Sequence, residues 1–179
     1  QYPLHPHFTV AVKKPLLKRI AEYVVDAMND PRHRTEQVDR SHREIMLGIA
    51  QPLELGTANE NVFHFKRDWL DHFNRCMAQQ GVRQPTVSDL RDWCDRPQAR
   101  GLSRDVADLV IWTFAQQSDR RFYNHNAPVT VSFDQLDGAM DLREQALPDE
   151  VLWSAAQERA GHAFGYSPDR QRNSATVGK

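Results

Sequence analysis

The sequence is poor in cysteine and has no long apolar run. Its 179 residues include only two cysteines, Cys76 and Cys94. Small secreted folds stabilised by disulfides usually carry more, so the pair indicates a reducing compartment, and we expect a cytoplasmic protein. No apolar stretch approaches the roughly 20 residues of a membrane-spanning helix, and the start lacks the features of a secretory signal. We therefore expect neither a membrane partner nor secretion.

The motifs that usually carry catalysis or cofactor binding are also missing. Gly48, Gly56 and Gly101 stand alone, so no glycine-rich phosphate-binding loop opens a helix, and no GxSxG elbow occurs. A serine or cysteine nucleophile served by a distant histidine stays open, because one sequence cannot exclude it. We predict a chain that is not an enzyme and needs no cofactor. Its start at Gln1 rather than Met favours a fragment of a longer protein.

One arrangement of possible metal ligands stands out among the eight histidines. His72 and Cys76 are four residues apart on an expected helix, and Cys94 could approach from the next helix. Structural zinc sites use four ligands, and the CxxC and HExxH spacings are absent. Buried structural cysteines are therefore the favoured interpretation. His5 and His7, in the N-terminal arm, form a weaker pair, and no metal site is predicted.

The composition is that of an ordinary globular protein with a mild charge asymmetry. Hydrophobic residues make up 40% and charged residues 26%, with a formal net charge of −1. Lys and Arg outnumber Asp and Glu by 12 to 10 in residues 1–84 and by 3 to 1 in residues 166–179, whereas residues 85–165 have 8 against 13. Any nucleic acid would therefore need a local basic surface in the front part. We interpret Asp134, Asp137 and Asp141 as solvated acidic surface.

Hydrophobic periodicity predicts a mainly α fold with short β-hairpins. After an arm that ends at Val12, helices are expected over about residues 15–28, 36–50, 67–80, 86–95 and 103–117, with hairpins over about residues 53–65 and 121–131. Thr86 and Asp89 are spaced as in a capping box, and Ser103 is the expected cap of its helix. A final helix begins near Pro148. Its apolar positions, spaced for packing, are Val151, Leu152, Ala155, Ala156, Ala160 and Phe164.

Helices followed by a hairpin occur twice, which is the order of a winged helix. We predict four segments: an N-terminal arm with a first winged-helix-like unit over residues 1–66, a second winged-helix-like unit over 67–133, an acidic connector with the C-terminal helix over 134–165, and a flexible tail over 166–179. The first of these units lacks a clear third helix.

Double-stranded DNA is the leading candidate partner of the front unit, because Lys and Arg make most phosphate contacts in DNA complexes. The candidate nucleic-acid-binding residues are Lys13, Lys14, Lys18, Arg40, His42, Arg43, Lys66 and Arg67. These charges could instead only solubilise helices, since the positive excess is small. On the expected helix 103–117, Asp105 and Asp108 occupy the polar side and would repel phosphate, so we expect protein contact there. A purely protein-binding or structural module is the alternative.

Several segments resemble one known family. These are the opening Tyr2-Pro3-x-His5-Pro6-x-Phe8 and the segments Ile49–Gly56, Gly101–Leu109 and Ala115–Arg120. Over about residues 1–165 the chain resembles the region after the ATPase core in the large P-loop ATPases of phage growth limitation and BREX phage-resistance systems. The resemblance implies an accessory domain of an AAA-like antiviral-defence ATPase, coupling nucleotide state to DNA or to other defence-system subunits. Since the phosphate-binding loop is absent, no ATP-binding or hydrolytic residue is carried over.

Overall fold

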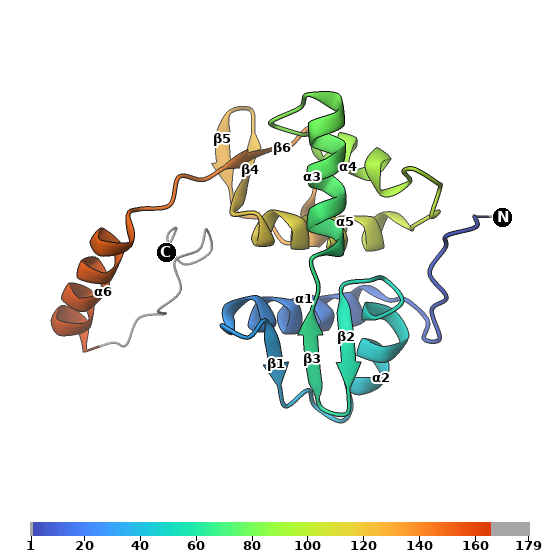
Figure 1. Cartoon of the computed structure of the whole chain (residues 1–179), viewed down its shortest axis with the longest axis horizontal. Helices are drawn as coiled ribbons and strands as arrows, with labels where there is room; N and C mark the ends of the chain where they lie inside the picture. Colours follow the sequence, from blue (N-terminus) through green and yellow to red (C-terminus); the bar gives the residue numbers. More distant parts are fainter. Residues whose placement is uncertain (1, 166–179) are drawn as a thin grey trace.

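The computed structural model describes residues 2–165, which form two units with a common hydrophobic core and one further helix set apart (Figure 1). The first unit consists of α1 (Lys14–Asn29), β1 (Arg34–Glu36), α2 (Arg43–Ile45), the π-helix η1 (Met46–Ala50), β2 (Gly56–Asn59) and β3 (Val62–Phe65). The second unit consists of α3 (Asp68–Gln80), α4 (Val87–Cys94), α5 (Arg104–Gln117), β4 (Arg120–Asn124), β5 (Ala127–Val129), η2 (Phe133–Gln135) and β6 (Asp141–Glu144). The expected fold class, mainly α with short β-hairpins and a C-terminal helix, is confirmed.

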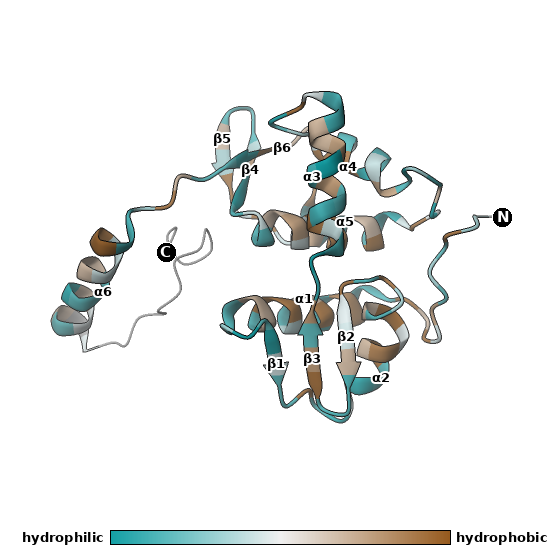
Figure 2. Cartoon of the chain, viewed as in Figure 1, coloured by the Kyte–Doolittle hydropathy of each residue, from teal (hydrophilic) through white to brown (hydrophobic). Residues whose placement is uncertain are grey.

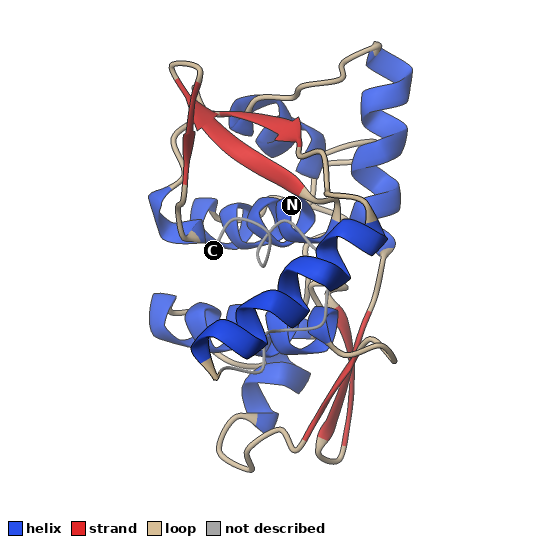
Figure 3. Cartoon of the chain, turned by 90° about the vertical axis from the view of Figure 1, so that its left-hand side faces the viewer, coloured by secondary structure: helices blue, strands red, loops and turns tan. Residues whose placement is uncertain are grey.

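Each unit contains one small antiparallel sheet. Sheet A, in the first unit, has the strand order β1-β3-β2, and sheet B, in the second unit, has the order β5-β4-β6. In Figure 3 the two sheets lie at opposite ends of the molecule, with helices between them. The predicted hairpin over residues 53–65 is confirmed as β2 and β3. That either unit is a winged helix stays a prediction.

The first helix follows from the sequence. Pro15 occupies its first turn, where the missing N–H costs nothing, and the apolar residues recur at helical spacing. Leu17, Ile20 and Val24 have no exposed surface. This face packs toward α5 of the second unit and toward sheet A. The two units are therefore held together by buried apolar side chains rather than by a flexible connection.

The predicted helix over residues 36–50 is wrong in its first half. The chain forms β1 up to Glu36, turns, and becomes helical only from Arg43. Asp39 explains the turn, because its Oδ1 accepts hydrogen bonds from the backbone N–H and the hydroxyl of Ser41, at 2.8 and 2.6 Å. Such local side-chain bonds compete with helix formation. Gln37, with a positive φ of 68°, also breaks the helical path.

The helices of the second unit agree closely with the sequence-based expectation. The capping box of α4 is present: Thr86 Oγ1 accepts from the Asp89 N–H, and the Asp89 carboxylate accepts from the Thr86 N–H. Ser103 occupies the N-cap position of α5 but makes no side-chain capping hydrogen bond. The segment expected as an acidic connector contributes β6, which pairs with β4.

The last helix, α6 (Glu150–Phe164), stands away from both units (Figure 1). Its start is hydrophobic (Figure 2), yet Val151 and Leu152 are 75% and 64% exposed. The expectation that these residues pack within the chain is therefore wrong, because α6 forms no extended contact with any element of the two units. The predicted flexible tail over residues 166–179 lies outside the described residues. No helix between residues 2 and 165 is long and apolar enough to cross a bilayer.

Candidate functional site

The lysines of α1 face the second unit. Lys14 Nζ lies 3.3 Å from Asp105 Oδ1 on α5, and Lys18 Nζ lies 3.0 Å from Asp134 Oδ2 in η2. The pKa of the Asp134 carboxyl is lowered, first by a hydrogen bond from Ser132 and then by one from Lys18. A phosphate would have to compete with these carboxylates for both amines. Lys13, by contrast, is exposed at the N-cap of α1.

The candidates around Arg40 lie at the turn before α2. Arg40 is exposed and has no ion pair among the described residues. His42 and Arg43 are half-buried. The His42 Nδ1 lies 2.9 Å from the Tyr23 hydroxyl, and the Arg43 Nε donates to the Val38 carbonyl at 3.5 Å. Of the three, Arg40 is therefore the side chain best placed to reach a ligand.

Lys66 and Arg67 occupy the link between sheet A and α3. Both are exposed, Arg67 is the N-cap of α3, and Lys66 Nζ lies 3.9 Å from an Asp68 oxygen. The turn that carries Arg40 is bound to the other end of β3, because the Val38 N–H donates to the Asn61 carbonyl at 2.7 Å. The structure thus distributes the eight predicted residues among three places: the contact between the units, the turn before α2, and the link before α3.

The two acidic residues expected on the polar side of α5 have different surroundings. Asp105 pairs with Lys14, as described above, and is half-buried. Asp108 is only 4% exposed, and its carboxylate accepts two hydrogen bonds from Arg91 of α4. The expectation of a solvated Asp108 is therefore wrong. The reason is that α5 is buried from Val106 to Ile111, so this side of the helix faces α4 instead of solvent.

Both cysteines are buried, and half-buried His72 lies beside Cys76 on α3. The Nε2 of His72 donates to the Trp93 carbonyl at 2.8 Å and lies 3.8 Å from the Cys76 sulfur. Burial raises the pKa of both Cys76 and Cys94, so the thiolate forms that bind metals or attack electrophiles are disfavoured. Within residues 2–165, no three His, Cys, Asp or Glu side chains are grouped closely enough to hold a metal ion.

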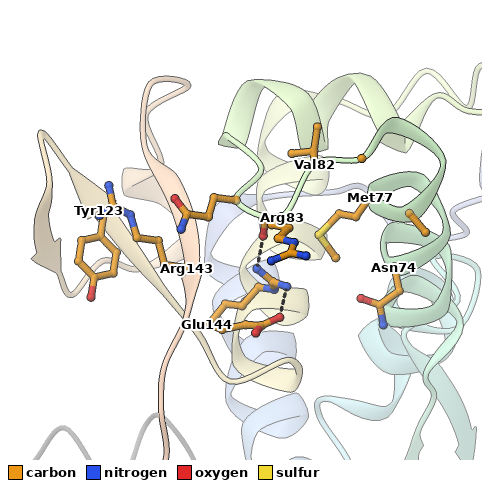
Figure 4. Close-up of a pocket in the computed structure, with 11 residues that line it drawn as sticks. Asn74, Met77, Val82, Arg83, Tyr123, Arg143 and Glu144 are labelled. Carbon is orange, nitrogen blue, oxygen red and sulfur yellow. Dashed lines mark hydrogen bonds and ion pairs between the residues drawn. The ribbon is translucent and has the colours of Figure 1, made fainter.

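A groove of about 740 Å³ lies between the C-terminal part of α3 and sheet B (Figure 4). Its lining includes three arginines, Arg83, Arg120 and Arg143, which come from the loop after α3, from β4 and from β6. Sequence reasoning missed this group, because the three residues are far apart in the chain and only the pairing of β6 with β4 brings two of them together. No local motif marks them.

A comparison with known protein families identifies the family of this chain. The family described as the fifth domain of the BREX system ATPase PglY matches residues 16–115, which extend from α1 into α5 and make up more than half of the chain. No solved structure matches it. The resemblance seen in the sequence to the ATPases of BREX phage-resistance systems is thereby confirmed. This chain belongs to the family of the fifth domain of the BREX ATPase PglY.

Proposed function

We propose that this domain is a non-catalytic interaction module of a cytoplasmic phage-defence ATPase, and that it docks onto another domain of the same ATPase through α6. One observation carries the proposal: Val151 and Leu152 are exposed on a helix that stands apart from both units (Figures 1 and 2). Burying one Val or Leu side chain in such a contact contributes roughly 1.5–3 kcal/mol of favourable free energy. An isolated helix of this length is only marginally stable in water, so α6 gains from a partner surface.

The occupant of this surface is a neighbouring domain, because a fifth domain implies that the parent ATPase has others. An exposed apolar surface on a helix is a common recognition element for an apolar groove. The two units suit such a role, because ion pairs from Lys14 and Lys18 reinforce their common core. Docking of α6 would therefore link this pair of units to the neighbouring domain.

Hydrogen exchange tests this docking. Backbone amides of α6 are compared between this chain alone and the whole ATPase. We expect exchange of the amides in α6 to slow by about tenfold or more in the whole protein, since packing suppresses helix opening. Equal exchange rates in the two samples would refute the docking of α6.

Two variants of the whole ATPase sharpen the experiment. Replacing Val151 and Leu152 by Asp should restore fast exchange in α6, because two charges would have to enter the apolar contact. The matched control is Leu47→Asp, since Leu47 is 50% exposed on η1 of the first unit. The control should leave exchange in α6 unchanged. An identical response to both changes would mean a general loss of structure and would count against a specific contact.

DNA contact through the first unit is the second candidate. It is supported by Arg40, which is exposed, carries no ion pair within the described part of the chain, and lies near the turn of the β2–β3 hairpin through the hydrogen bond from Val38 to Asn61. The order of helix, strand, helix and hairpin in this unit is related to that of winged-helix DNA-binding proteins, in which a helix and a hairpin contact the duplex. The alternative is a module without nucleic-acid affinity.

Fluorescence anisotropy with a labelled 20-bp duplex at two salt concentrations tests this second candidate. We expect binding that weakens steeply with salt and falls about fivefold or more in Arg40→Glu, because phosphate contacts release counterions. Arg75→Glu, at an exposed position of α3, makes the same change in charge and should have a much smaller effect. Absence of binding at low salt, or equal losses in both variants, would exclude the Arg40 surface.

A further inference from the structure

The groove between α3 and sheet B offers an apolar side and a basic side to one ligand. Figure 4 shows how its labelled residues lie: Asn74, Met77 and Val82 on the α3 side, Tyr123 and Arg143 on the side of sheet B, and Arg83 and Glu144 between them. A volume of about 740 Å³ is within the usual range of ligand-binding sites. Gly81, with a φ of 66°, ends α3 at the lining of the groove, and a Cβ added to it would meet no atom within 4 Å.

Arg120 is the buried cation of the groove. Its exposure is only 7%, and its guanidinium donates to the Arg83 carbonyl at 2.9 Å and to Glu144 Oε1 at 2.7 Å. Its Nε is buried and has no hydrogen-bond partner. Burying a charge is costly unless it is paired and hydrogen-bonded, and here the single carboxylate partner lies on the surface. The wall of the groove is thus built around an incompletely satisfied cation.

Arg143 is held in place for recognition. Its guanidinium lies 4.4 Å from the centroid of the Tyr123 ring, and it also donates to Asp141 and to Asn126. A guanidinium that is stacked on an aromatic ring and hydrogen-bonded loses little freedom when it binds a carboxylate. Arg83, in the loop after α3, is exposed and has no ion pair between residues 2 and 165. The two arginines thus provide one fixed and one freely available cation.

A ligand with carboxylate groups suits the charge of this groove. Three arginines and one glutamate line it; Arg120 pairs with Glu144 and Arg143 with Asp141, so Arg83 contributes the positive charge that has no carboxylate partner among the described residues. Met77, Ala78 and Val82 add apolar surface, and the amides of Asn74 and Gln84 can bond to a peptide backbone. Acidic residues that alternate with apolar ones in an extended segment would meet both sides, because successive side chains point in opposite directions.

A peptide fits this groove better than DNA does. Residues 85–165, which include the two strands that line the groove, contain 13 Asp and Glu against 8 Lys and Arg, so this part of the chain has a net negative charge. A long polyanion experiences that surrounding field along its whole length and is repelled. A short peptide experiences chiefly the groove itself, since charges beyond about 8–10 Å are screened at physiological salt.

We propose that this groove binds a short, extended peptide segment of a partner protein in which acidic and apolar residues alternate. Carboxylates of the segment pair with Arg83 and Arg143, and its apolar side chains pack on Met77 and Val82. The site is distinct from α6, and neither proposal depends on the other. It gives the domain a second contact, formed by residues of α3 and sheet B.

The test uses this chain and a fluorescein-labelled hexapeptide of sequence Glu-Leu-Glu-Leu-Glu-Leu, with anisotropy as the readout. We expect saturable binding and a dissociation constant that rises about tenfold or more in Arg83→Glu, because the reversed charge repels the peptide. The matched control is Arg75→Glu on α3, which makes the same charge change at an exposed position outside the groove. The control should change the dissociation constant by less than about twofold, because Arg75 is exposed to solvent and does not line the groove.

Further arms separate the alternatives. Val82→Asp should also weaken binding, because it places a carboxylate on the apolar side, and thermal unfolding checks that each variant is folded. Absence of saturable binding to the wild-type chain would overturn the proposal, and so would equal losses in Arg83→Glu and Arg75→Glu. A labelled Lys-Leu-Lys-Leu-Lys-Leu peptide should not bind. If a single-stranded DNA 12-mer displaced the acidic peptide, the groove would be assigned to nucleic acid instead.

Discussion

Arg91 and Asp108 form a two-point ion pair between α4 and α5. Arg91 Nε lies 2.7 Å from Asp108 Oδ1, and Arg91 Nη2 lies 3.0 Å from Asp108 Oδ2. The same Nη2 also donates to the Leu136 carbonyl at 3.0 Å, which ties the chain ahead of β6 to both helices. The side chain of Asp108 is 6% exposed and that of Arg91 is 21% exposed. This pair therefore anchors the second unit at the point where three segments meet.

We expect Asp108→Ala to destabilise the protein by about 3–5 kcal/mol, because it leaves the Arg91 guanidinium partly buried without its anion. Urea denaturation followed by tryptophan fluorescence measures the change. The double variant Arg91→Met with Asp108→Leu should lose less than the sum of the single changes, since it leaves no buried unpaired charge and the remaining partner of Asp108, Arg104, is exposed. Additive losses would show that the two side chains do not act as a pair.

The common core predicts that the two units unfold together. The chain has four tryptophans, Trp69, Trp93, Trp112 and Trp153, and all of them lie outside the first unit. Ile20→Ala in α1 should nonetheless lower the midpoint of the tryptophan transition, by an amount equivalent to about 2–5 kcal/mol. Leu47→Ala, at an exposed position of the same unit, should have little effect. A tryptophan transition unaffected by Ile20→Ala would indicate independent units.

Local sequence pattern was sufficient for those helices whose apolar residues recur on one face. The helix expected over residues 103–117 is observed as Arg104–Gln117, and the capping box at Thr86 is present. The pattern failed over residues 36–42, where the side chain of Asp39 forms a turn that periodicity does not reveal. It also failed for β6, whose only strongly apolar residue is Leu142, fully buried against β4.

The candidate site was less predictable than the fold, because it depends on contacts between distant segments. Lys14 and Lys18 appear in the sequence as free positive charges on a helix, and only the packing of α1 on α5 gives them acidic partners. Conversely, Arg120 and Arg143 appear as isolated charges until the register of β4 and β6 places them near one groove. Composition fixes how many charges there are, whereas tertiary structure decides which of them stay available.

Two glycines with almost the same φ allow a test of whether Tyr2, in the N-terminal arm, packs on Gly101. Gly101 has a φ of 62° and would place an added Cβ against the ring of Tyr2, whereas Gly81 has a φ of 66° and faces open space. We expect Gly81→Ala to cost about 1 kcal/mol through backbone strain alone, and Gly101→Ala to cost more. Thermal denaturation compares the two.

Tyr2→Ala serves as the control for that comparison. In its background the extra cost of Gly101→Ala should disappear, because the ring no longer occupies the space. If Gly101→Ala and Gly81→Ala cost the same in the wild-type chain, Tyr2 does not pack on Gly101 in solution.

The pKa of His72 predicts a specific pH dependence of stability. Burial lowers this pKa, with the hydrogen bond to Trp93 acting in the opposite direction. The unfolded chain, in which a histidine has a pKa of about 6.5, therefore binds the proton more readily than the folded chain does. By linkage, stability rises with pH across this window and is lost as the pH falls below about 6.5.

We accordingly expect the free energy of unfolding, measured in urea, to fall between pH 7 and pH 5, with a shallower slope in His72→Gln. The glutamine amide can still donate to the Trp93 carbonyl, so this variant removes the titration while a donor remains. NMR titration of the imidazole gives the direct check, with a midpoint below about 6.5 expected for His72. A midpoint above that value, or an unchanged slope in His72→Gln, would mean that the imidazole is not buried as a neutral donor between α3 and α4.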